Sequence, residues 1–177
     1  MSQDPFKILG IEPVFDIDVR AVETRHRELS RALHPDKFAS APAAERRMAL
    51  SRAIEVNEAW RAIRDPIKRA EALFRHIGVP AGETAEPNPS TDLLMEMMEA
   101  REELADAARA KDMGAVHNLS LKMQLREKET LSKLTQGFQK ANEDLSEARK
   151  LLHHLGELRY LRRFLDEVAA IEEAALG

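Results

Sequence analysis

Histidine and carboxylate side chains are the groups of this chain that could transfer protons or hold a metal ion. The chain has 6 His, 31 Asp plus Glu and no Cys, which excludes disulfides, thiolate catalysis and cysteine-bound zinc or iron–sulfur clusters. His153 and His154 are adjacent, so their rings should point in different directions on a helix and should not share a metal. With no glycine-rich phosphate loop and no recognisable nucleophile–base pair, we predict no catalytic residue, metal site, cofactor or enzymatic activity.

One short motif has the composition of a recognition element. His34, Pro35 and Asp36 stand in sequence in a predicted loop. Pro35 fixes the backbone of this loop, and Asp36 offers a carboxylate that can pair with a cation on a partner. An ordinary turn is the alternative interpretation, because loops are rich in Pro and Asp.

The segment from Asp18 to Leu33, directly before this motif, is predicted to be a helix. At about 100° per residue its apolar side chains share one narrow arc, which we expect to be buried. The members of this arc are Val19, Val22, His26, Leu29 and Leu33. Arg20, Arg27 and Arg31 form a second stripe about 140° away, where they could dock on an acidic surface or simply be solvated.

Composition points to an all-α protein. Charged residues make up 33% of the 177 residues and aromatic residues 5%, with 7 Gly, which is typical of long solvated helices. The net charge of −4 provides no positive field for generic nucleic-acid binding. Residues 1–78 hold 14 basic and 12 acidic side chains, so the acidic excess lies in the rest of the chain. No apolar run approaches the roughly 20 residues that span a bilayer, and we expect a cytoplasmic protein without membrane contact.

Three prolines and a glycine between Val79 and Pro89 predict a linker that divides the chain. We expect one domain in residues 1–78, a linker in 79–89 and a second domain in 90–177. The first domain should consist of a short helix, a long helix, a loop, a long helix and a short helix. The predicted helices span residues 4–9, 18–33, 43–63 and 65–78.

The second domain is predicted to be an elongated three-helix bundle. Ser90 or Asp92 can cap a first helix that reaches about residue 110, and Asp112 can cap a second that ends near Gly137. The third helix should begin at residues 142–144. Its packing seam consists of Leu151, Leu155, Leu158, Leu161, Leu165 and Val168. Gly156 lies inside this helix, where Gly costs about 1 kcal/mol relative to Ala and weakens continuity.

Three stretches of the first domain together resemble a J-domain over residues 4–76. They are residues 29–38 (LSRALHPDKF), residues 57–66 (NEAWRAIRDP) and residues 69–73 (RAEAL). The resemblance implies a co-chaperone that binds a heat-shock ATPase of the DnaK or HscA class and stimulates its ATP hydrolysis. The chaperone-binding residues implied by the family pattern are His34, Pro35, Asp36, Arg20, Arg27, Arg31 and Lys37.

The first helix of the second domain carries apolar residues on two sides. One side is expected to face the bundle and contains Leu93, Met97, Ala100, Leu104 and Ala107. Leu94, Met95 and Met98 occupy another sector beside charged residues, and burial of the first side should leave them exposed. Exposed Leu and Met suit recognition of a peptide or protein.

Residues 94–104 (LMEMMEAREEL), downstream of a J-domain-like segment, resemble the scaffold-binding helix of the HscB family of iron–sulfur co-chaperones. The resemblance implies that the helical domain binds an IscU-type scaffold and delivers it to the chaperone. The scaffold-binding residues that it implies are Leu94, Met95, Met98, Phe164, Glu99, Arg101 and Glu102. Phe164 is displaced from the leucine seam of the third helix, and a buried aromatic edge is the alternative for this residue. A monomer is expected. The alternative is a general J-domain co-chaperone whose helical half dimerises or binds other clients.

Overall fold

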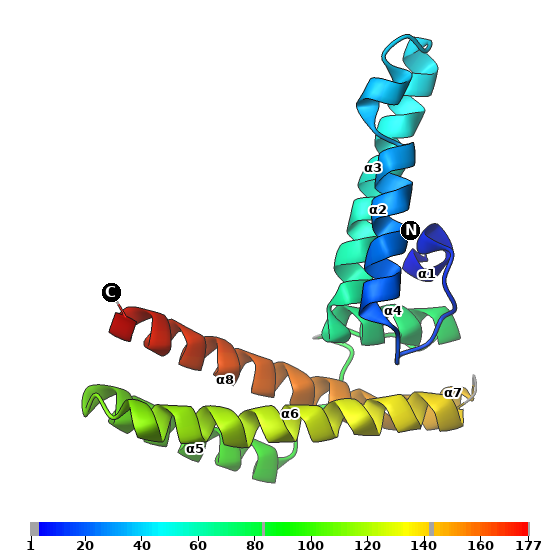
Figure 1. The fold of residues 1–177 in the computed structure, drawn as a ribbon. Helices are drawn as coiled ribbons and strands as arrows, with labels where there is room; N and C mark the ends of the chain where they lie inside the picture. The colour runs from blue at the N-terminus through cyan, green and yellow to red at the C-terminus, as the bar shows by residue number, and fades with distance from the viewer. Residues whose placement is uncertain (1–3, 83, 142–143, 177) are drawn as a thin grey trace. The chain divides into compact units, whose positions relative to one another are not determined.

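The computed structural model describes residues 4–82, 84–141 and 144–176, and every regular element in these ranges is helical (Figure 1). The all-α prediction is therefore confirmed. The chain divides into two compact units, Met1–Pro80 and Ala81–Gly177, which we call the N-terminal and C-terminal units. The division lies inside the segment predicted to be a linker. Within the described ranges no helix is long and apolar enough to cross a bilayer.

The N-terminal unit is built on a hairpin of two long helices, which lie side by side in Figure 1. Its elements are α1 (Pro5–Leu9), α2 (Val19–Ala32), the 3-10 helix η1 (Pro35–Phe38), α3 (Ala43–Arg64) and α4 (Pro66–Ile77). The predicted order of helices is confirmed, and the loop that holds the histidine motif contains the additional short helix η1.

Side chains at the ends of these helices explain where they start and stop. The carboxylates of Asp4, Asp18 and Asp65 accept hydrogen bonds from backbone N–H groups of the first turn of α1, α2 and α4. Gly10 and Gly78 end α1 and α4 with φ of 66° and 91°, a left-handed conformation that glycine adopts without strain. These boundaries agree with the predicted ones because capping depends on neighbouring residues alone.

The apolar arc predicted on α2 is buried only in part. Val22 is buried, His26, Leu29 and Leu33 are half-buried, and Val19 is exposed. The prediction that all five are buried is wrong, because α2 packs chiefly on a single neighbour, α3.

His26 joins the two helices of the hairpin through a polar contact. Its Nε2 atom lies 2.9 Å from Asn57 Oδ1, and its ring stacks on Trp60 with 5.5 Å between ring centroids. A histidine on the packing face of α2 therefore has a structural role.

The C-terminal unit is a bundle in which α5, α6 and α8 pack along one another (Figure 1). Its elements are α5 (Thr91–Arg109), α6 (Met113–Ala141), α7 (Leu145–Lys150) and α8 (Leu152–Leu176). The predicted third helix is two helices, because the chain breaks at Leu151, whereas Gly156 lies within the continuous α8. Asp144 caps α7, and the other two predicted start residues, 142 and 143, lie outside the described residues.

Helix α6 continues past its predicted end at Gly137 to Ala141. The side chain of Leu151 packs against the bare backbone of Gly137. Glycine at this position therefore serves close helix packing and does not end the helix.

Gly137 of α6 and Gly156 of α8 differ in the atoms that an added methyl group would contact. A Cβ atom on Gly137 would collide with the Leu151 side chain, whereas one on Gly156 would lie 3.6 Å from Glu86 Oε2, an ordinary contact. We expect Gly137→Ala to lower the free energy of unfolding by about 1–3 kcal/mol and Gly156→Ala to raise it by about 1 kcal/mol or less. Urea denaturation monitored by circular dichroism measures both. Equal effects would contradict the close packing of Leu151.

Candidate functional site

The histidine motif of the N-terminal unit is shaped by short-range hydrogen bonds that leave its side chains in solvent. His34 caps η1: its Nδ1 accepts a bond from the Asp36 backbone N–H at 3.4 Å, and its carbonyl accepts one from Lys37 N–H at 3.0 Å. Pro35 occupies the first position of η1, where its fixed φ suits the helix and no N–H is needed. His34, Asp36 and Lys37 are exposed. The motif is thus ordered and accessible.

The predicted basic stripe lies on the exposed side of α2. Arg20, Arg27 and Arg31 are all exposed, and the Arg27 Nη2 atom lies 2.6 Å from Glu23 Oε1 on the preceding turn. At about 1.5 Å per residue the stripe extends roughly 17 Å along the helix. Since α2 ends at Ala32 and His34 caps η1, the stripe and the motif directly follow one another along the chain.

Helix α5 presents the predicted second surface. The side that faces the bundle is buried, as predicted, and comprises Leu93, Met97, Ala100, Leu104 and Ala107. Leu94, Met95 and Met98 are exposed by 38%, 56% and 63%. We call these three residues the α5 apolar patch. Their exposure agrees with the prediction, and large apolar side chains kept in solvent favour a protein partner.

Phe164 does not belong to this surface. It has no accessible area and lies in the core of the bundle with Met97, Leu161 and Val168. The prediction that Phe164 is a contact residue is therefore wrong for this structure. Phe164 takes the buried position of the α8 seam that the sequence analysis assigned to Leu165, which is only half-buried.

The polar neighbours of the patch have different environments. Glu99 and Glu102 are exposed, whereas Arg101 is half-buried and pairs with Glu167 of α8, at 2.9 Å from Nη2 and 3.2 Å from Nε. This two-pronged pair joins α5 to α8 and holds Arg101 in one geometry. Sequence reasoning missed Glu167, because a contact between residues 66 positions apart leaves no local signal.

A second interhelix contact was also invisible in the sequence. Arg126 of α6 lies 2.5 Å from Glu96 of α5 and 2.8 Å from Glu157 of α8, so one guanidinium joins all three long helices. Partial burial by itself lowers the pKa of Arg126, but the hydrogen bonds to the two carboxylates outweigh this effect and raise it. The contact stabilises the bundle on which the α5 apolar patch is displayed.

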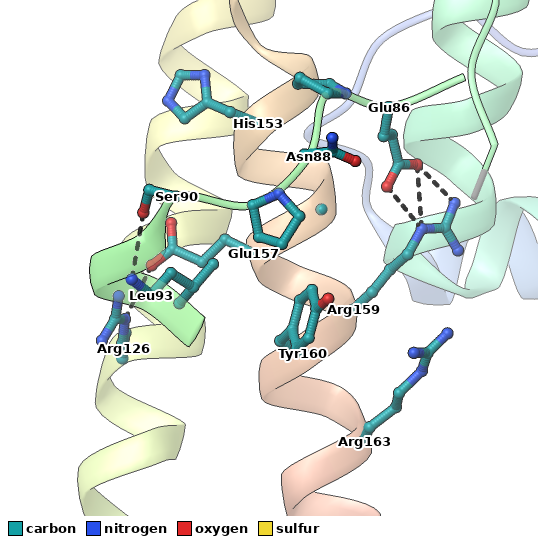
Figure 2. Close-up of a pocket in the computed structure, with 13 residues that line it drawn as sticks. Glu86, Asn88, Ser90, Leu93, Arg126, His153, Glu157, Arg159, Tyr160 and Arg163 are labelled. Atoms are coloured by element: carbon teal, nitrogen blue, oxygen red, sulfur yellow. Dashed lines mark hydrogen bonds and ion pairs between the residues drawn. The ribbon is translucent and has the colours of Figure 1, made fainter. Parts of the chain in front are cut away.

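A pocket of about 420 Å³ lies where the segment 86–90 passes over α6 and α8 (Figure 2). Its lining includes Gly156 and Tyr160 of α8 and Glu86, whose carboxylate accepts hydrogen bonds from the Arg159 guanidinium. Ser90, at the other end of the segment, accepts a hydrogen bond from Leu93 N–H at 3.2 Å. The segment is thus attached to α8 at one end and to the first turn of α5 at the other.

His153 and His154 lie beside this region, with ring centroids 3.8 Å apart, so the prediction that the rings point apart is wrong. His154 Nδ1 is buried without a hydrogen bond and lies 3.7 Å from Glu157 Oε2. Burial, and to a smaller extent the nearby His153, lowers the pKa of His154 below its ordinary value. In the described part of the chain, no three metal-binding side chains gather as a metal site requires.

The two sides of α5 allow a matched test of the site geometry. Met97 is 1% exposed and Met98 is 63% exposed, although they are adjacent in sequence. We expect Met97→Ala to lower the free energy of unfolding by about 2–5 kcal/mol and Met98→Ala to change it by less than about 0.5 kcal/mol. Thermal and urea denaturation measure both variants. A large loss of stability in Met98→Ala would show that the patch is part of the core.

The pKa of His154 predicts a pH dependence of stability. Between the ordinary histidine pKa near 6.5 and the lower folded-state pKa, the unfolded chain binds more protons, so stability falls as the pH decreases through this window. Urea midpoints at pH 7.5 and pH 5.0 measure the effect. His154→Gln should reduce the difference between the two midpoints, and the exposed control His117→Gln should retain it. An unchanged difference in His154→Gln would exclude His154 as the cause.

Comparisons with known proteins cover nearly the whole chain. Residues 89–169 match the family described as "HSCB C-terminal oligomerisation domain". A "Co-chaperone protein HscB homolog" from Neisseria meningitidis serogroup A is 31% identical over 165 residues, which are 93% of this chain and 96% of that protein. Its counterpart in Shewanella oneidensis is 31% identical over 171 residues, 97% of this chain and 98% of that protein.

Solved structures give the same result at the level of the fold. Chaperone HscB from Vibrio cholerae superposes with a TM-score of 0.82 at 26% identity, covering 97% of this chain and 99% of that one. The human co-chaperone protein HscB superposes with a TM-score of 0.84 at 20% identity, covering 97% of this chain and 83% of that one, which shows the shared fold alone. With two curated relatives matched over more than nine-tenths of their length, this chain belongs to the HscB family of co-chaperones.

Proposed function

We propose that this chain is a co-chaperone of iron–sulfur cluster assembly that binds an IscU-type scaffold and presents it to a heat-shock ATPase of the HscA or DnaK class. The observation that carries the proposal is that the residues expected to bind the chaperone and the α5 apolar patch are exposed, in a chain that matches HscB co-chaperones over almost its full length. The absence of Cys is compatible with a reducing compartment, and we place this activity in the cytoplasm.

The N-terminal unit is proposed to dock on the chaperone. The guanidinium groups of Arg20, Arg27 and Arg31 can each pair with carboxylates in two-pronged geometry, which favours an acidic partner surface and faster association at low salt. His34 and Asp36 stand at the end of this stripe and would reach the groups that control ATP hydrolysis. In this proposal the chemistry takes place in the chaperone, and no residue of this chain is catalytic.

The C-terminal unit is proposed to hold the scaffold through the α5 apolar patch. Met95 and Met98 are unbranched and polarizable, so they adapt to the shape of a partner surface. Glu99 and Glu102 form a charged rim around the patch, which would determine the orientation of the bound scaffold more than its affinity. Burial of the three exposed side chains would supply the central contact that dominates most protein interfaces.

A single chain that carries both surfaces couples the two partners. Once the scaffold is bound to the C-terminal unit, its local concentration near the chaperone is set by the connecting chain and not by the bulk solution. The proposed consequence is that this chain and the scaffold together stimulate ATP hydrolysis more than this chain does alone. This explains why a protein without catalytic groups would need two separate recognition surfaces.

Self-association of the C-terminal unit is the second candidate function. The matching family is described as an oligomerisation domain, and the exposed α5 apolar patch could pair with a second copy. Sedimentation equilibrium from about 5 to 200 μM distinguishes the candidates. A mass that stays at 20.0 kDa favours scaffold binding by the patch, and a mass that doubles with loss of scaffold binding favours self-association.

The steady-state ATPase rate of an HscA-class chaperone, with and without an IscU-type scaffold, tests the proposal. His34→Gln should abolish stimulation in both conditions. The triple variant Leu94→Ala, Met95→Ala and Met98→Ala should keep the stimulation seen without scaffold, but lose about 2 kcal/mol or more of scaffold binding, roughly a thirtyfold weaker Kd. The matched control is Leu121→Ala with Leu125→Ala, because these exposed residues lie on α6 outside the patch. Normal scaffold affinity in the triple variant would contradict the proposal.

A further inference from the structure

Most of the segment 86–90 precedes the family match, which begins at residue 89. The segment is nevertheless attached to the C-terminal unit by hydrogen bonds. Three hydrogen bonds join the Glu86 carboxylate to Arg159 of α8: two from Nε at 3.0 Å and one from Nη2 at 2.9 Å. The two side chains are only 6% and 14% exposed. Figure 2 shows the Arg159 side chain reaching toward Glu86 on the far side of the pocket from α5.

The Glu86 carboxylate also lies beside the backbone of α8. Gly156 lies one turn before Arg159, and a Cβ atom there would lie 3.6 Å from Glu86 Oε2, which is an ordinary contact. The segment therefore packs closely on α8 next to the ion pair, and this packing does not require a glycine at position 156.

Four residues connect Glu86 to the start of α5. Pro87 and Pro89 restrict the backbone of these residues. Ser90 caps α5: its hydroxyl accepts a hydrogen bond from Leu93 N–H, and its carbonyl accepts one from Leu94 N–H at 3.1 Å. The α5 apolar patch lies in the first two and a half turns of this helix. Because the first turns of a helix fray unless they are capped, the order of the patch depends on what fixes this end.

We propose that the Glu86–Arg159 ion pair is a positioning element for the α5 apolar patch: it anchors the segment 86–90, which in turn fixes the capped start of α5 in its binding-competent form. This inference rests on the proposed scaffold-binding function of the patch. Glu86 and Arg159 act through the segment and Ser90, and they need not touch the scaffold themselves.

Amide hydrogen exchange and scaffold affinity together test the inference in the full chain. In Glu86→Gln, exchange at residues 93–98 should rise about tenfold while α6 keeps its wild-type protection. The Kd for an IscU-type scaffold should weaken by a similar factor, because affinity falls with the populated fraction of the competent form. Chaperone stimulation without scaffold should stay unchanged. Ser90→Ala, which removes the cap directly, should give the same pattern and serves as the second variant if Glu86→Gln does not fold.

The control variant is Glu127→Gln, which breaks an Arg–Glu pair between α6 and Arg162 of α8 that has no connection to the segment 86–90. It should leave exchange at residues 93–98 and scaffold affinity as in the wild type. Wild-type exchange at 93–98 in Glu86→Gln, raised exchange throughout α6 and α8, or unchanged scaffold affinity would each overturn the inference. If the wild-type protein binds no scaffold, the proposed function is wrong. A rise in exchange confined to residues 93–98 in Glu86→Gln would still support the role of the ion pair in positioning the start of α5.

Discussion

Burial of one side of α5 against α6 and α8 is the constraint on which the C-terminal unit depends. A helix has 3.6 residues per turn, so neighbouring residues point in different directions. When Leu93, Met97 and Leu104 face the core, Leu94 and Met98 must therefore face away from it. The same packing that stabilises the bundle therefore produces the apolar surface that a partner can recognise. No extra element is needed to display the patch, and loss of the core side would remove the patch as well.

Charged contacts between helices determine how rigidly that surface is held. Arg126 joins α5, α6 and α8, and Arg101 joins α5 to α8 through Glu167. Each pair is partly buried and geometrically defined, so it adds orientation to a core made of non-directional apolar contacts. The proposed anchor at Glu86 extends this principle to the segment that precedes α5.

In the N-terminal unit the exposed arginines and the His34 motif are positioned mainly by local structure. Its proposed recognition surface is formed by residues that are close along the chain, because α2 with its three arginines directly precedes the His34 motif. Local hydrogen bonds shape the motif, and α2 is held against α3 by the contact between His26 and Asn57. A surface of this kind can be recognised in the sequence, since its parts are close along the chain.

Much of this protein follows from the sequence by itself. Capping residues such as Asp18 and Ser90 determine where helices begin, and periodicity separates Met97 from Met98, because both effects act within a few residues. The tertiary structure alone decided that Phe164 is buried and that Glu86 meets Arg159. Periodicity gives the angles of side chains around one helix, but the sector that becomes buried depends on where the neighbouring helices pack, and this is determined by contacts between distant residues.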